Sequence, residues 1–167
     1  MGQYGYQELG GSPLGDISAV VTSLPAGPQL GDERVHNGIK YRLVYNAGGA
    51  SGPVGSVMSP VPLAGGAYSV TVTTASDSRN HVGAVVVVHN TATTGAYFWG
   101  AYQGTVTLIP SATISAGKFC MVGATGKVTS APSLPTETVG NRGNILVVTS
   151  GNTAGAATMT GYVSFVS

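Results

Sequence analysis

The fold class is decided by the segment Arg34-Val35-His36-Asn37-Gly38-Ile39-Lys40-Tyr41 and its continuation to Tyr45. Asn-Gly between two β-prone runs is typical of a two-residue type I′ hairpin turn, because both central positions of that turn need a positive φ. After the turn, the large apolar side chains of Tyr41, Leu43 and Tyr45 occupy alternate positions, as in a strand that buries one face. The segment therefore predicts an antiparallel β-hairpin.

The rest of the chain repeats this pattern of short strands and turns. It holds 26 Gly and 9 Pro, and no apolar spacing of 3.6 residues persists beyond two turns. Because β-branched residues dominate the ordered stretches, we expect an all-β body with a sandwich, jelly-roll or barrel architecture. The run of valines from Val85 to Val88 predicts a buried central strand. The further expected strands are 56–58, 68–74, 82–89, 96–102, 105–109, 118–122, 127–129, 145–150 and 158–166.

The N-terminal residues 1–31 differ from the body, which we place at 32–167. Glycines and prolines interrupt every regular element there, yet the segment stays apolar, unlike a disordered tail. Two interpretations are open: an extended arm that docks onto a neighbouring subunit, or a segment that folds back onto its own domain. The candidate contact residues in it are Tyr4, Tyr6, Leu9, Leu14, Ile17 and Leu24.

Charge is scarce, with seven basic and six acidic residues and a net charge of +1. Nucleic-acid binding needs clustered Lys and Arg, so we expect no nucleic-acid partner. No apolar run approaches the roughly 20 residues that span a bilayer, so we expect no membrane partner. The N-terminus lacks the features of a secretory leader, and we expect assembly in a cytoplasm. A charge content of 8% is low for a free domain and indicates a surface covered by other subunits.

The sequence carries none of the common catalytic motifs, and we expect a non-enzymatic protein with no cofactor. The cluster of Asp32, Glu33 and His36 is incomplete as a metal site, because Glu33 points to the other face of the strand. We therefore expect no metal. Cys120 stands alone in an apolar run and is expected to pack as a small hydrophobe.

The aromatic segment Tyr97-Phe98-Trp99-Gly100-Ala101-Tyr102 is the remaining candidate site. On a strand, Tyr97 and Trp99 face one way and Phe98 and Tyr102 the other. One pair would then lie in the core, while Tyr97 and Trp99 would be available for a subunit contact or for sugar stacking. The alternative is that both faces are covered within one fold.

One set of segments is distributed over roughly residues 30–166: 30–35, the turn Asn37-Gly38, 41–50, 94–106 and the stretch from Ile114 to Val128. Together these segments resemble the small head decoration proteins of tailed phages. It implies a capsid decoration (cement) protein bound in many copies to the outer surface of the virion head. The expected partners are the major capsid protein, which it would bridge to stabilise the expanded shell, and a dimer or trimer of the chain itself. Assembly would take place in the host cytoplasm.

Two other functions share the expected architecture. A receptor-binding or tail-fibre module would use exposed Tyr97 and Trp99 to bind glycans. A tail-tube or head-completion protein would form rings in isolation.

Overall fold

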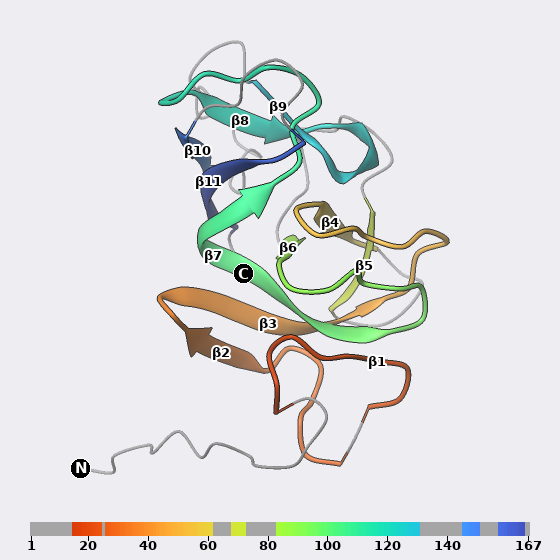
Figure 1. The fold of residues 1–167 in the computed structure, drawn as a ribbon. Coiled ribbons are helices and arrows are strands. Elements are labelled where there is room, and N and C mark those ends of the chain that lie inside the picture. The colour runs from red at the N-terminus through yellow and green to blue at the C-terminus, as the bar shows by residue number, and fades with distance from the viewer. Residues whose placement is uncertain are drawn as a thin grey trace, which may run out of the picture.

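The computed structural model describes residues 15–24, 26–61, 68–72, 83–130, 145–150 and 157–165, with the backbone alone described at 145–150. These residues confirm the all-β class (Figure 1). No helix among them is long and apolar enough to cross a membrane. The strands are β1 (Val20–Val21), β2 (Glu33–His36), β3 (Ile39–Asn46), β4 (Val57–Pro60), β5 (Ser69–Val72), β6 (Val85–Val87), β7 (Tyr97–Leu108), β8 (Phe119–Val122), β9 (Val128–Ser130), β10 (Ile145–Ser150) and β11 (Met159–Ser164), with a 3₁₀ turn at η1 (Ala124–Gly126).

Strand β7 organises the sheet. With twelve residues it is the longest of the described strands, and one of its edges pairs with β3. The other edge receives β1 at Phe98, β6 at Ala101 and β11 from Gln103 to Leu108. Strands from four parts of the chain are therefore aligned on a single ribbon.

The sheet closes on itself at β7. The pairings run β3–β5, β5–β4, β4–β6 and β6–β7, and β7 then pairs with β3. Of the three expected architectures, this ring corresponds to a small barrel (Figure 1). Closure removes the free edges of β4, β5 and β6, so the valines of β6 are fully buried as the sequence predicts.

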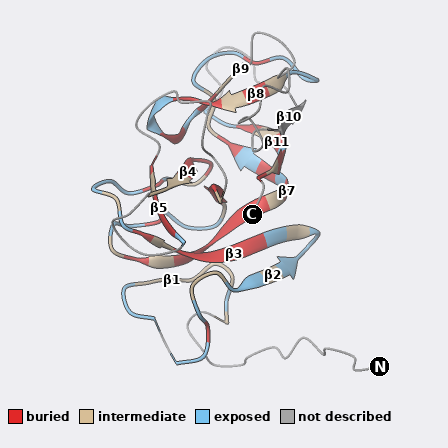
Figure 2. Ribbon diagram, turned by 180° about the vertical axis from the view of Figure 1, so that it is seen from behind, coloured by how far each residue is buried: buried red, intermediate tan, exposed pale blue. Residues whose placement is uncertain are grey.

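Beyond the barrel, β11, β10, β8 and β9 extend the sheet from the second half of β7. Here burial alternates along the strand: Val106 and Leu108 are buried, while Thr105 and Thr107 are exposed. The first half of β7 is instead buried on nearly every residue (Figure 2). The same strand thus changes from two covered faces to one covered face.

The predicted hairpin is confirmed. Asn37 has φ 49° and Gly38 has φ 77°, and His36 pairs with Ile39 across the two-residue turn. The two strands expected at 96–102 and 105–109 are in fact the single strand β7. The pairing steps from Lys40–Gln103 to Tyr41–Ala101, so Tyr102 forms a bulge, and Gly104 with φ 130° lets the strand continue past it.

A recurrent turn starts many of the strands. In the turn before β4, the Ser56 amide donates to the Pro53 carbonyl at 3.0 Å, and Gly55 supplies the positive φ of 89° that the turn requires. A glycine with positive φ stands two residues before each of six strands, at Gly31, Gly55, Gly83, Gly95, Gly117 and Gly126. The turns thus define where these strands begin.

Gly100 in β7 lies where the barrel leaves no room for a side chain. A Cβ there would come within 2.6 Å of Val85 Cβ. We expect Gly100→Ala to lower the free energy of unfolding by about 1–3 kcal/mol, the usual cost of overpacking a core. Urea denaturation measures this cost.

Gly49→Ala is the matched control, because nothing lies within 4 Å of a Cβ at that position. Equal unfolding free energies for the two variants would contradict the tight packing of β6 against β7.

Candidate interaction site

Residues 15–21, which we call the N-terminal strap, lie across the first half of β7. Val20 and Val21 pair with Phe98 and Tyr97 as strand β1. Ile17, in the part of the strap before β1, is half-buried and packs against the core. The strap is therefore part of the body, and it covers one face of the barrel.

Two side chains from the body hold the strap by its backbone carbonyls. Arg34 Nη1 donates to the Gly15 carbonyl at 2.9 Å, and Asn90 Nδ2 donates to the Ser18 carbonyl at 2.8 Å. The Arg34 guanidinium also lies 4.6 Å from the centre of the Trp99 ring, in cation–π geometry. Arg34 therefore joins the strap, β2 and β7 at one point.

The strap turns just before it enters the sheet. Asp16 Oδ1 accepts hydrogen bonds at 2.8 Å from both the amide and the hydroxyl of Ser18. These bonds, more than the nearby His89, hold the pKa of Asp16 below its ordinary value. His89 itself stacks on the Tyr41 ring, with centroids 5.8 Å apart and Nε2 at 3.3 Å from the Tyr41 hydroxyl. A shallow depression remains between the strap and these residues, lined by Ile17, Ala19, Val88, His89, Asn90 and Trp99.

The N-terminal candidates are only partly described. Tyr4, Tyr6, Leu9 and Leu14 lie outside the described residues. Ile17 belongs to the strap, while Leu24 follows it and is 36% exposed. In this structure residues 15–21 fold back onto their own domain, as one of the two interpretations predicts. The division into an arm of residues 1–31 and a body of 32–167 stays a prediction.

The expectation that Trp99 is available at the surface is wrong. Its side chain is only 2% exposed, because the strap and Arg34 cover the ring. Tyr97 is half-buried, and its ring lies 4.9 Å from that of Tyr45 at a tilt of 41°. Both faces of the aromatic segment are covered within one fold, the alternative that the sequence left open.

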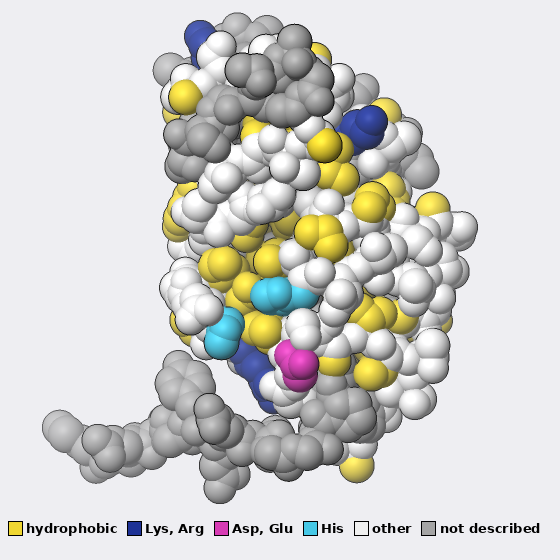
Figure 3. All heavy atoms as spheres, viewed as in Figure 1, with side chains coloured by type: hydrophobic (Ala, Val, Ile, Leu, Met, Phe, Trp, Pro, Cys, Tyr) yellow, Lys and Arg dark blue, Asp and Glu magenta, His cyan; other side chains and the backbone are white. Residues whose placement is uncertain are grey.

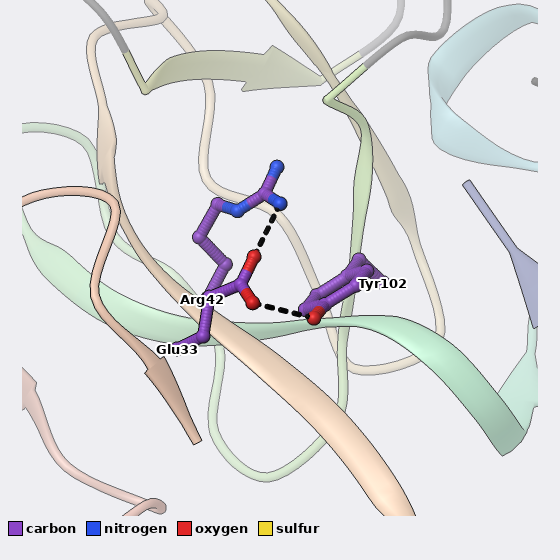
Figure 4. Close-up of polar contacts among 3 residues, drawn as sticks. All are labelled: Glu33, Arg42 and Tyr102. Atoms are coloured by element: carbon purple, nitrogen blue, oxygen red, sulfur yellow. Dashed lines mark hydrogen bonds and ion pairs between the residues drawn. The ribbon is translucent and has the colours of Figure 1, made fainter. Parts of the chain in front are cut away.

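A second cluster joins β2 to the barrel. Arg42, on β3, is 4% exposed and donates from Nη2 to Glu33 Oε1 at 2.6 Å (Figure 4). The other carboxylate oxygen of Glu33 accepts a hydrogen bond from the Tyr102 hydroxyl at 2.9 Å. The guanidinium also lies 4.7 Å from the Tyr102 ring centre and 5.6 Å from that of Tyr68. A buried cation needs such a partner, so Glu33 fixes β2 to the bulge of β7.

The pKa values of this cluster follow from its contacts. The hydrogen bond from Arg42 is the main cause that lowers the pKa of Glu33 below its ordinary value of 4.5. Burial is the main cause that raises the pKa of Tyr102, and its hydrogen bond to Glu33 adds to the effect.

Cys120 lies outside this cluster and is buried, which confirms that it packs as a hydrophobe. Burial raises the pKa of its thiol to about 11. Elsewhere, Asp32 accepts from the Gln29 amide at 2.8 Å, and the described residues contain no group of three or more His, Cys, Asp or Glu placed to hold a metal.

The face that carries the strap has few charged side chains. Figure 3 shows hydrophobic side chains gathered around histidine near its centre, with acidic and basic side chains directly beside them and mostly uncharged atoms elsewhere on this face. Depletion of charge is a property of surfaces that become buried in protein assemblies.

Arg34 and Asn90, which hold the strap, were not singled out from the sequence. The sequence places Arg34 in the hairpin but gives no sign of its partner, since the contacts of Arg34 and Asn90 with the strap are 19 and 72 residues away.

Comparison with known proteins identifies a fold neighbour. No protein-family model matches the chain, and no curated protein matches it by sequence. Among solved structures, the head fiber gp8.5 N base of bacteriophage phi29 is similar, with a TM-score of 0.50 and 9% sequence identity. The match covers 75% of this chain and 94% of that chain. The two proteins therefore share a fold across nearly the whole of the fibre base.

The Arg42–Glu33 pair predicts a pH dependence. Because the folded pKa of Glu33 is lowered, its contribution to stability is present above pH 4.5 and is lost as the pH falls through the folded pKa. We expect Glu33→Gln to cost about 1–2 kcal/mol at pH 7, which is the value of about 1.5–3 kcal/mol for a hydrogen bond to a charged group, reduced because solvent screens the half-exposed Glu33. Urea denaturation at a series of pH values should show this difference shrinking towards pH 3. A difference that stays constant over that range would contradict the assignment.

The contact of Arg34 with the strap predicts a local effect on hydrogen exchange. We expect Arg34→Ala to raise the hydrogen-exchange rates of the strap amides several-fold, because the strap loses one of its two side-chain anchors. Global unfolding should change less than the local opening. Lys40→Ala is the control, since Lys40 is exposed on β3 and its substitution leaves both anchors intact. Equal exchange rates at Val20 and Val21 in the two variants would show that Arg34 does not hold the strap.

Proposed function

We propose that the chain is a non-enzymatic structural protein of a phage head, and specifically a capsid decoration protein. The observation that carries this proposal is the fold shared with the base of the phi29 head fibre, which covers 94% of that base. The resemblance of the sequence to head decoration proteins points to the same part of the virion. Fold alone does not establish function, so the proposal also depends on the surface described above.

In this proposal the protein binds the outer surface of the head in many copies and bridges major capsid proteins. If it binds the expanded shell and not the unexpanded one, mass action stabilises the expanded state. Its partners are the major capsid protein and further copies of itself, as a dimer or trimer. It resides in the virion and assembles in the host cytoplasm, without a cofactor, nucleic acid or membrane.

The barrel and the strap suit this role. The closed ring of β3 to β7 provides a body that does not present the edges of β4, β5 and β6 to other chains. The contact between Arg34 and Gly15 fixes the point at which the preceding fourteen residues join the body. An apolar segment attached at a fixed point loses less entropy when it docks than one attached through a loose linker.

The rival functions are supported less well. A glycan-binding module that stacks sugars on Tyr97 and Trp99 needs exposed rings, and Trp99 is buried beneath the strap. Ring formation by the isolated protein would favour a tail-tube or head-completion role.

A second candidate function is the base of a head fibre, because the fold neighbour is itself such a base. Both functions place the protein on the phage head.

Co-sedimentation with expanded, undecorated heads of the parent phage tests the proposal. Three forms are compared: the full chain, a chain that lacks residues 1–14, and the Arg34→Ala variant. The truncation stops before Gly15, so the strap and its anchors remain. We expect saturable binding of the full chain at a fixed ratio to the capsid subunit, with roughly tenfold weaker binding of the truncated chain, equivalent to about 1.4 kcal/mol.

Absence of binding by the full chain at any concentration would overturn the decoration role. Binding by the full chain and the truncated chain with equal affinity would leave the role intact but place the contact on the body. Unexpanded heads serve as the control for specificity to the expanded shell.

A further inference from the structure

The strap contacts the body through one short, continuous segment. Its described contacts with the body are the β1–β7 pairing, the two carbonyl hydrogen bonds from Arg34 and Asn90, and the packing of its apolar side chains. All of these contacts are made by residues 15–21. The edge of β7 at Tyr97 and Phe98, together with Arg34 and Asn90, forms the binding site of the strap, which we call the seat on β7. The seat would make the same contacts with residues 15–21 of any copy of the chain.

The linker after the strap leaves the body surface. Thr22, Ser23, Leu24, Ala26 and Gly27 are all exposed, and the chain becomes buried again at Pro28. Residues 28–32 are held on the body, because Pro28 is buried and the Gly31 amide donates to the Leu43 carbonyl at 2.9 Å. The linker is therefore residues 22–27, which reach up to about 20 Å when extended, at roughly 3.3 Å each. That reach would let the strap lie on the barrel of a copy packed directly beside its own.

We propose that the seat on β7 accepts the strap of a second copy of this chain, so that neighbouring copies exchange residues 15–21. The exchanged state contains the same contacts as the closed state, and only the path of the linker differs. Exchange of an identical element is a low-cost route to oligomers for this reason. In the exchanged assembly, Gly15 and Ser18 of one copy accept hydrogen bonds from Arg34 and Asn90 of the next.

The chemistry of the seat selects this occupant. The edge of β7 at Tyr97 and Phe98 supplies backbone pairing, which tolerates many sequences. Selectivity comes from the apolar side chains of the strap, which pack on the core beside Trp99. The carbonyl hydrogen bonds from Arg34 and Asn90 fix the position of the strap. A strand from an unrelated protein would lack this combination.

The inference deepens the proposed function, because it identifies how copies on the head surface would be joined to each other. Linked copies also gain avidity, since each strap holds its neighbour near the next capsid site. The exchange is measurable without heads, so its failure is distinguishable from failure of capsid binding.

Mixed disulfide trapping tests the exchange. In a Cys120→Ser background, an affinity-tagged Val21→Cys chain is mixed at high concentration with an untagged Tyr97→Cys chain and then oxidised. Val21 and Tyr97 are directly paired across β1 and β7, so a disulfide between different chains forms efficiently when straps exchange. We expect the tagged–untagged dimer on a non-reducing gel at a yield at least fivefold above the control.

The control replaces Val21→Cys with Leu24→Cys, because Leu24 is exposed on the linker and lies outside the β1–β7 pairing. This mixture reports random collision between accessible thiols. Equal yields in the two mixtures, or a Val21→Cys mixture that stays monomeric, would overturn the exchange.

A second pair guards against disruption of the aromatic contact between Tyr97 and Tyr45. Val20→Cys and Phe98→Cys form the second pair, because Val20 and Phe98 are also directly paired across β1 and β7 and the substitutions leave the Arg34 and Asn90 anchors intact. We expect the same excess of mixed dimer over the Leu24→Cys control. Circular dichroism of each variant checks that the β-structure is retained, and a folded pair that gives no excess counts against the proposal.

Discussion

The pairing of β7 along both of its edges is the constraint on which the rest of the structure depends. One edge is filled by β3, and the other receives β1, β6 and β11 in succession. Because a single strand carries the register of both the barrel and its extension, the two parts cannot shift independently. Gly100 is a consequence of that crowding, since a Cβ there would come within 2.6 Å of Val85 Cβ.

The strap follows from the same constraint. The first half of β7 places Phe98 and Trp99 on opposite faces, and the barrel can cover only one of them. Residues 15–21 cover the other face, and Arg34 closes the cover by contacting both Trp99 and Gly15. Such a segment need not belong to the same chain as the residue that it covers, because any copy of the segment provides the same contacts. The geometry that completes the monomer is thus also the geometry that could link monomers.

The sequence predicted those features that depend on neighbours in the chain. Asn37-Gly38 identified the hairpin, and the valine run identified β6, because turn chemistry and burial are local signals. It divided β7 in two at Gly104, since a glycine in a strand reads as a break when the partner strand is unknown. Trp99 was misplaced for a related reason. Whether a strand has one covered face or two depends on which distant segment lies over it.

The scarcity of charge gives Arg42 and Arg34 particular weight. Each guanidinium lies over an aromatic ring and donates to an oxygen of another strand or of the strap. Such contacts are directional, whereas the valine-rich core would tolerate several packings. The two arginines therefore specify where β2 and the strap lie, and the hydrophobic core supplies most of the stability. In the proposed role on a phage head this division of labour would matter, because errors in the position of the attached segments would be repeated at every site.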